Sequence, residues 1–340
     1  MTVRLSHIAE RAGVSVASVS RVLNDKPGVA ESTRRAVLTA IDVLGYERPT
    51  RLRSREAGLI GLIVPELENP IFPRMAQAVE VALVRHGYTP VLCTQSLGGV
   101  HEDDYVTTLM DRGVSGIIFV SGIHAIADTD PDRYQAYVDG GLPIVLVNGC
   151  IPVIGATCIS ADDIESAELA VSHLAQLGHR RIGLATGQSR YQPVVRRTEG
   201  FKAAMRRHVD ADLTDADLDE LVERTVFTME GGATAAHTLL DRGVTAIVCG
   251  SDVMAIGAIT TARRRGLSVP RDVSIVGSDD STLIQYTDPP LTTVRQPAGA
   301  IGRAAAAALV DQISGVPAIT SEMLFRPELV VRGTTAGLPL

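Results

Sequence analysis

The chain has 340 residues, of which 45% are hydrophobic, and a formal net charge of −7. This length predicts two or three folding units, and the composition excludes a disordered chain. Apolar runs such as 59–64 are far shorter than the roughly 20 residues that span a bilayer. The first residues alternate charged and apolar side chains, without the apolar stretch of a signal peptide. We therefore expect a cytoplasmic protein with no membrane partner.

The charge is unevenly distributed along the chain. Residues 1–58 carry ten Lys and Arg against six Asp and Glu, whereas the remainder carries 22 against 33. A small basic head on a large acidic body is typical of a polyanion-binding module joined to a domain with another task.

The cysteines and histidines indicate neither a disulfide framework nor a metal site. Cys93, Cys150, Cys158 and Cys249 form no CxxC pair, so in a long cytosolic chain we expect four buried, reduced thiols. The eight histidines are scattered without ligand spacing. We expect no metal and no cofactor.

Residues 5–45 predict three short helices. In the first, Ser6 is the expected N-cap, and Gly13 ends the helix. Ser15 is the expected N-cap of a second helix over 16–24, and a third runs over 31–44. Apolar residues recur at helical spacing in all three: Ile8, Ala9, Ala12, Val19, Val22, Leu23, Val37, Ile41 and Leu44.

Two short helices joined by a tight turn predict a helix-turn-helix whose second helix enters the major groove of DNA. Its outward side chains are then Val16, Ala17, Ser20 and Arg21. Candidate phosphate donors are Ser6, Ser15, Ser18, Thr33 and Arg34. The pattern alone also allows a helical bundle that binds no DNA.

The string LSHIAERAGVSVASVSRVLND, from Leu5 to Asp25, resembles the headpiece of the lactose/galactose-repressor family. The resemblance implies that Val16 and Ala17 select the operator sequence, that Arg21 contacts a base edge, and that Asn24 is a further DNA-binding residue. Two small apolar residues can contact a thymine methyl but make no bidentate hydrogen bond. We therefore expect Arg21 to carry most of the direct polar readout.

A basic segment follows the headpiece, with Arg48, Arg51, Arg53 and Arg55 over 47–58. Such a run is typical of a solvated linker, or of a segment that follows phosphates or enters the minor groove. The resemblance implies a hinge helix here with Leu52 as its minor-groove wedge. The stretch from Tyr46 to Gly61 is three residues shorter than the lactose repressor's pattern, so a hinge helix that is shorter or differently placed is expected.

From residue 59 onward, strand and helix patterns alternate, and the pattern after 162 repeats the one after 59. Apolar strands are predicted over 59–65, 89–94, 116–121, 143–148, 181–186, 246–250 and 273–277. Continuous apolar strands between amphipathic helices predict parallel sheets covered on both faces. We expect two doubly wound α/β lobes, with ligands bound beyond the carboxyl ends of the strands.

Strings such as RRTEGFKAAM and GSDVMAIGAITTARRRGLSVPRDVSIVGSDD resemble the same family's sensor domain, which is similar to periplasmic sugar-binding proteins. The resemblance implies two lobes with three crossovers and an effector between them. It places lobe 1 at about 59–161 and 291–318, and lobe 2 at about 162–290 and 319–340.

The resemblance also implies an effector site. Arg197 matches the arginine that grips effector oxygens, Asp279 the carboxylate that accepts from sugar hydroxyls, and Phe227 the aromatic platform. Departures from the usual pattern, at Asn148, Ser251 and Ser278, prevent any transfer of effector identity. The expected effector-binding residues are Ile71, Phe72, Ser121, Asn148, Arg197, Phe227, Ser251 and Asp279.

These features predict a homodimeric repressor that binds a palindromic double-stranded DNA operator under the control of a small molecule, most simply a sugar. A purine or another non-sugar corepressor is an alternative effector. A solute-binding protein for transport would share the sensor fold but have a signal peptide instead of a headpiece. An enzyme is not expected, because the chain has no GxSxG elbow, Walker loop or metal set. The end of the chain shows no leucine heptads, so no coiled-coil tetramer is expected.

Overall fold

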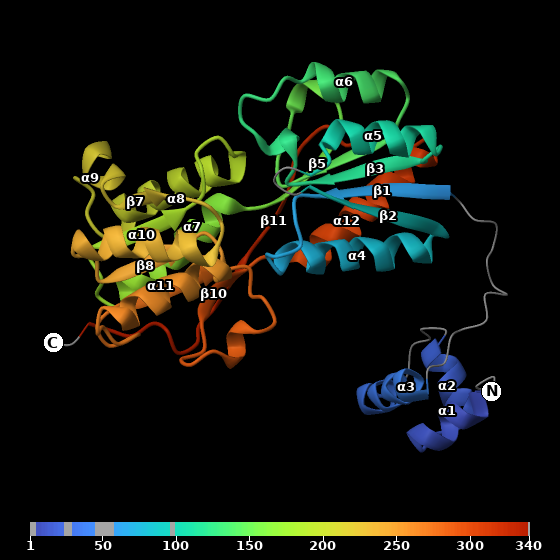
Figure 1. Cartoon of the computed structure of the whole chain (residues 1–340), viewed down its shortest axis with the longest axis horizontal. Coiled ribbons are helices and arrows are strands. Elements are labelled where there is room, and N and C mark those ends of the chain that lie inside the picture. Colours follow the sequence, from blue (N-terminus) through green and yellow to red (C-terminus); the bar gives the residue numbers. More distant parts are fainter. Residues whose placement is uncertain (1–4, 24–28, 45–57, 96–98, 339–340) are drawn as a thin grey trace. The chain divides into compact units, whose positions relative to one another are not determined.

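The computed structural model describes residues 5–23, 29–44, 58–95 and 99–338 of the chain. It divides into two compact units, residues 1–55 and 56–340 (Figure 1). We call them the headpiece and the sensor unit. Within the described ranges, no helix combines the length and apolar character that crossing a bilayer requires.

The headpiece consists of α1 (Leu5–Ala12), α2 (Val16–Leu23) and α3 (Glu31–Leu44). Its small core is built from one apolar stripe on each helix: Ile8, Ala9, Val19, Val22, Val37 and Ala40. The predicted helices are therefore confirmed, with one difference at the start. Because α1 already begins at Leu5, Ser6 lies inside the helix and is not its N-cap.

The first lobe of the sensor unit contains a six-stranded parallel sheet in the order β11-β5-β4-β3-β1-β2. Helices α4 and α12 cover one face, and α5 and α6 cover the other. The elements are β1 (Gly58–Val64), α4 (Ile71–Arg85), β2 (Tyr88–Thr94), α5 (Glu102–Asp111), β3 (Gly116–Val120), η1 (Ile123–Ala125), α6 (Asp132–Asp139), β4 (Ile144–Val147), η2 (Pro152–Ile154), β5 (Thr157–Ala161), α12 (Ala298–Ile313) and β11 (Met323–Phe325).

The second lobe repeats this architecture with a six-stranded sheet in the order β12-β10-β9-β8-β6-β7. Only β12 runs antiparallel to its neighbour among the described strands. The elements are α7 (Asp163–Gln176), β6 (Ile182–Thr186), α8 (Gln192–His208), α9 (Asp215–Asp219), β7 (Val222–Arg224), α10 (Met229–Asp241), β8 (Ala246–Cys249), α11 (Asp252–Arg264), β9 (Ser274–Ser278), η3 (Ile284–Tyr286), β10 (Thr292–Arg295) and β12 (Glu328–Val330).

The seven predicted strands are all present, with ends within one residue of those expected. Their sequences are continuous apolar runs because helices cover both faces of each sheet. In β3, for example, all five residues of GIIFV are buried. The chain crosses between the lobes three times: from β5 to α7, from β10 to α12, and from β11 to β12.

The expected lobe boundaries were wrong at the C-terminal end. Strand β10, expected in lobe 1 as part of 291–318, pairs with β9 in lobe 2. Strand β11, expected in lobe 2 as part of 319–340, pairs with β5 in lobe 1. Strands of three and four residues near the lobe crossovers do not encode their sheet in their own sequence, so only their hydrogen-bonded neighbours reveal which sheet they join.

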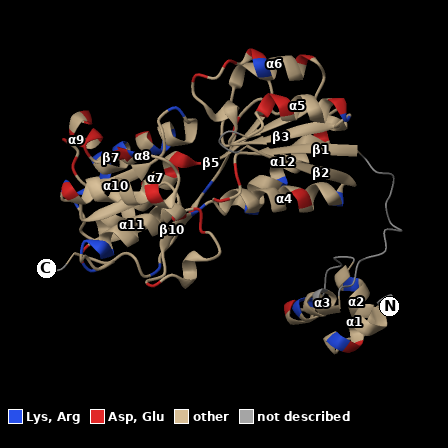
Figure 2. Ribbon diagram, in the orientation of Figure 1, with Lys and Arg blue, Asp and Glu red and all other residues tan. Residues whose placement is uncertain are grey.

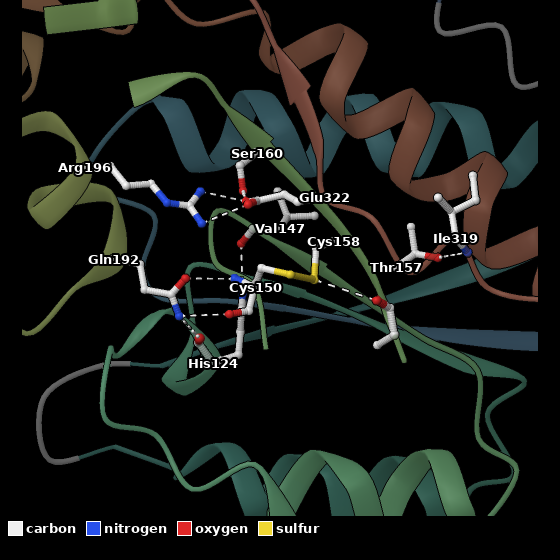
Figure 3. The surroundings of a disulfide bond; sticks show 11 residues. His124, Val147, Cys150, Thr157, Cys158, Ser160, Gln192, Arg196, Ile319 and Glu322 are labelled. Atoms are coloured by element: carbon white, nitrogen blue, oxygen red, sulfur yellow. Dashed lines mark hydrogen bonds and ion pairs between the residues drawn. A yellow bond between two sulfur atoms is a disulfide. The ribbon is translucent and has the colours of Figure 1, made fainter. Parts of the chain in front are cut away.

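The expectation of four reduced thiols was also wrong. Cys150 and Cys158 form a disulfide, with 5.3 Å between their Cα atoms, whereas Cys93 and Cys249 are free and buried. The bond closes the loop between the neighbouring strands β4 and β5 (Figure 3). The two cysteines are eight positions apart in the sequence, so the pairing depends on the return of the chain through this loop and has no short sequence signature.

Candidate functional site

A cavity of about 250 Å³ lies between the two lobes of the sensor unit. Seven of the eight expected effector-binding residues line it: Ile71, Phe72, Ser121, Asn148, Arg197, Phe227 and Asp279. These residues span more than 200 positions in the sequence, and the fold brings them together at one place. The cavity is therefore the candidate effector site.

The ends of the strands supply much of the polar lining. Ser121 follows β3, Asn148 follows β4, and Asp279 follows β9. All three have positive φ angles, of 47°, 63° and 117° respectively. Side chains other than glycine rarely adopt such angles, and where they do they concentrate at functional sites. This conformation turns the side chains from the strand direction into the cavity, where the Asn148 amide donates to the Ser121 hydroxyl at 3.1 Å.

Arg197 is the only cationic side chain that lines the cavity among the residues that the structure describes. It projects from α8 and is 6% exposed. Its Nη1 donates to the carbonyl of Gly250 at 2.6 Å, and its Nη2 donates to Asp163 at 2.7 Å. The buried Nε has no hydrogen-bond partner among the described residues. A buried N–H without a partner is costly, so a ligand oxygen that accepts from it would bind favourably.

Asp163 forms a buried ion pair with Arg197, and both side chains are less than 10% exposed. Burial raises the pKa of Asp163, while the adjacent guanidinium opposes this shift. The ion pair fixes the position of Arg197 from the lobe-crossing end of α7. Sequence reasoning missed Asp163, although the Asp162-Asp163 pair directly before an amphipathic helix was a visible signal.

Asp279 is the second buried carboxylate of the cavity, and it is 2% exposed. One of its oxygens accepts from the side-chain amide of Gln296 at 2.8 Å. Burial, then the nearby Asp252 carboxylate, raises the pKa of Asp279 well above that of an ordinary aspartate. Burial also raises the pKa of Asp252 to about 6, even though Ser281 and Thr293 donate to it.

The apolar part of the cavity combines aromatic and aliphatic side chains. Phe72 and Ile71 come from the start of α4 in lobe 1, whereas Phe227 and Tyr191 come from lobe 2. Phe227 packs so closely on Gly187 and Gly250 that a Cβ at either position would overlap its ring. The ring therefore has room in this position only because both neighbours are glycine. A flat apolar surface beside polar side chains is typical of a small-molecule site.

Ser251 does not line the cavity, contrary to the expectation. It is 1% exposed, and its hydroxyl accepts from the backbone N–H of Met254 at 3.2 Å. This is the N-cap of α11, so the hydroxyl is already committed to the helix. Sequence reasoning also missed Tyr191 and Gln296, which do line the cavity. Gln296 directly follows β10, and nothing in its sequence neighbourhood singled it out as a ligand-binding residue.

In the headpiece, α2 exposes the side chains expected to face DNA. Val16, Ala17 and Arg21 are exposed and Ser20 is partly so, while the opposite side of α2 is buried in the headpiece core. The Ser15 hydroxyl accepts from the backbone N–H of Ser18 at 3.1 Å, which confirms the expected cap at the start of α2.

The other expected phosphate contacts lie at the surface. Ser6 and Ser15 are exposed, and Ser18, Thr33 and Arg34 are partly exposed. Asn24, Arg51 and Leu52 lie outside the described residues. In Figure 2 the ribbon positions of Lys and Arg are blue, and each headpiece helix contains at least one Arg.

Two family models match the chain. Residues 4–49 match the bacterial regulatory proteins of the lacI family, and residues 171–335 match a periplasmic binding protein-like domain. The HTH-type transcriptional regulator reg1 of Streptomyces lividans is 56% identical over 339 residues, covering 100% of this chain and 98% of the relative. The chain belongs to the lacI family. It is a DNA-binding transcription regulator, as the sequence predicted.

Solved structures of lacI-family regulators share its fold over nearly the whole chain. A complex of the transcriptional regulator CelR with cellobiose has a TM-score of 0.73 and 31% identity, covering 98% of this chain and 99% of that one. A structure of the lac repressor dimer bound to operator and the anti-inducer ONPF has a TM-score of 0.70 and 26% identity, covering 99% and 100%. The predicted headpiece with a two-lobed α/β sensor is thus confirmed for this lacI-family regulator.

Proposed function

We propose that this lacI-family regulator is a repressor whose affinity for a palindromic operator is controlled by a sugar bound between its lobes. The observation that supports a sugar is the composition of the cavity. Arg197, Asp279 and Asn148 offer hydrogen-bonding groups beside the rings of Phe72 and Phe227. Hydroxyl groups pair with the polar side chains, and the C–H face of a sugar ring packs on the aromatic ones.

The proposed assembly is a homodimer that presents two headpieces to two half-sites. The lac repressor structure with similar fold is a dimer bound to operator, and two-fold symmetry would place the half-sites about one helical turn apart. In each headpiece, Arg21 contacts a base edge while Val16 and Ala17 select the sequence. The regulator acts in the cytoplasm, where the operator lies, and it releases its effector chemically unchanged.

Control by the effector requires that the sugar bind one arrangement of the lobes more tightly than the other. Both lobes line the cavity, so a bound ligand contacts both and its affinity depends on their arrangement. Phe72 and Asn148 belong to lobe 1, and Arg197 and Phe227 belong to lobe 2. Bound effector then shifts the population of lobe arrangements, and operator affinity changes with it.

The first test is a thermal-shift screen of the full chain against monosaccharides, disaccharides, nucleosides and purine bases. A ligand at one hundred times its Kd should stabilise the native state by about 2.7 kcal/mol. A sugar that raises the melting temperature and changes operator affinity supports the proposal. A purine hit without a sugar hit would assign the protein to the corepressor alternative.

A substitution of Arg197 then tests whether the effector binds in this cavity. Arg197→Ala should abolish the response to the effector while operator binding by the headpiece persists, because the headpiece is a separate compact unit. The matched control is Arg326→Ala, since Arg326 is 84% exposed and pairs only with Glu165 among the described residues. An effector affinity unchanged in Arg197→Ala would remove Arg197 from the site.

A further inference from the structure

The charges that line the cavity are mostly negative. Among the residues that the structure describes, Glu66, Asp163 and Asp279 line it with carboxylates, and Arg197 alone lines it with a cation. The Asp163 carboxylate lies 2.7 Å from Arg197 Nη2 and neutralises that cation. Behind the lining, the buried Asp252 adds a further carboxylate close to Asp279.

This balance persists whichever way Asp279 titrates. Burial raises the pKa of Asp279, so protonation would remove one negative charge. Glu66 and Asp163 still outnumber the single guanidinium. Glu66 is fixed in place, because its Oε2 accepts from the backbone N–H groups of Glu68 and Asn69.

Neighbouring guanidinium groups do not restore a positive field in the cavity. Arg196, adjacent to Arg197 in sequence, is held by both oxygens of Glu322 at 2.7 and 2.8 Å (Figure 3). Arg74 donates to the backbone carbonyl of Asp280 and does not line the cavity. Arg190 is exposed and does not line the cavity, and its guanidinium lies over the ring of Tyr191 and donates to the Tyr191 hydroxyl at 2.8 Å.

A phosphate or carboxylate taken into this cavity would lose its hydration and meet carboxylates without an unpaired cation. Desolvation of an anion is expensive unless an opposite charge compensates it. An uncharged hydroxyl has a much smaller desolvation cost than an anion, and it can accept a hydrogen bond from a guanidinium and donate one to a carboxylate. The same donors and acceptors therefore suit an uncharged polyol and oppose its acidic derivatives.

We infer that the cavity selects an uncharged sugar against phosphorylated and carboxylated sugars, and that Asp163 sets this selectivity by neutralising Arg197. The inference rests on the proposed sugar effector and specifies its chemical class. Asp163 acts on the ligand through Arg197, so it is a positioning and charge-balancing residue.

The test compares matched pairs of ligands by isothermal titration calorimetry with the full chain. The pairs are cellobiose and cellobionate, maltose and maltobionate, glucose and glucuronate, and ribose and ribose 5-phosphate. We expect the neutral member of at least one pair to bind, and its acidic partner to bind at least about tenfold more weakly. An acidic member that binds as tightly as its neutral partner would overturn the inference but leave the sugar-effector proposal intact. If no member of any pair binds, the sugar-effector proposal fails, and this inference falls with it.

Asp163→Asn identifies the residue responsible. It removes one negative charge with little change in shape and leaves Arg197 without its counter-ion, so the affinity ratio of acidic to neutral partner should rise at least about tenfold. Glu165→Gln is the control, because it makes the same charge change on the same helix outside the cavity lining and should leave the ratio unchanged. An unchanged ratio in folded Asp163→Asn contradicts the role of Asp163. The wild-type pairs decide the charge selectivity even if this variant does not fold.

Discussion

Arg21 is the one long polar side chain on the exposed face of α2, where it lies with Val16, Ala17 and the partly exposed Ser20. Arg21→Ala should cost about 1–3 kcal/mol of discrimination between operator and random DNA, because small apolar neighbours cannot replace a bidentate contact to a base. The measurement is operator and non-specific affinity over a series of salt concentrations. An equal loss on both DNAs would show that Arg21 contacts phosphate and not a base.

Asp279 should make the stability of the sensor unit depend on pH. Its pKa is raised in the folded state, whereas its pKa in the unfolded chain is about 3.9. At a pH between these two pKa values, the unfolded chain releases a proton that the folded chain retains. Stability therefore falls as pH rises through this window. In Asp279→Asn, stability should fall less between pH 4 and 8 than in the wild type, as followed by urea unfolding of the sensor unit.

The control for this pH dependence has the opposite sign. Asp215 is exposed, and Arg206 lowers its pKa, so its contribution to stability grows as pH rises above the folded pKa. This change is complete below the unfolded value of about 3.9, so Asp215→Asn should leave the slope between pH 4 and 8 unchanged and should alter stability, with the opposite sign, only below pH 4. Identical pH profiles for wild type and Asp279→Asn would mean that Asp279 titrates normally.

At the scale of elements, the loop between the lobe 1 strands β4 and β5 is hydrogen-bonded to lobe 2. Gln192, the first residue of α8 in lobe 2, donates to the backbone carbonyl of Cys150 at 3.1 Å and accepts from its N–H at 3.0 Å. The same amide donates to the carbonyl of His124 (Figure 3). The disulfide therefore restrains a segment of lobe 1 at its contact with lobe 2.

Protein purified without reductant should contain two titratable thiols after denaturation and four after reduction, because Cys150 and Cys158 are paired. This measurement tests the pairing of the two cysteines directly. Reduction should destabilise the sensor unit by up to about 2–3 kcal/mol, the chain-entropy value for such a short loop. Reductant should not change the stability of a Cys150→Ala, Cys158→Ala double variant. Four thiols before reduction would contradict the pairing.

At the scale of the whole molecule, the headpiece and the sensor unit have separate cores. Calorimetry of the full chain should therefore show two unfolding transitions, with the larger enthalpy in the sensor unit because of its size. Without coupling between the two units, an effector should raise only the transition temperature of the sensor unit. A matching operator duplex should likewise raise only that of the headpiece. The size of any additional shift when both ligands are present measures the coupling between them. A single transition that both ligands raise equally would contradict separate unfolding units.

The sequence by itself determined what depends on short-range pattern. Apolar periodicity and residues a few positions apart predict the three headpiece helices, the cap at Ser15 and the seven strands expected from the sequence. All of these are present. The family resemblance further identified seven of the residues that line the cavity. These signals are local, or they are shared by a family, so they are readable in one chain.

Only the tertiary structure decided what depends on contacts between distant segments. Three features require the folded chain: the sheets that β10 and β11 join, the disulfide between Cys150 and Cys158, and the ion pair between Asp163 and Arg197. Ser251 illustrates the same limit, because its hydroxyl serves as the N-cap of α11 and not as a cavity contact. Side-chain type and position in the sequence do not reveal which partner lies nearest in space, and the nearest partner decides whether a polar group binds a ligand or holds the fold.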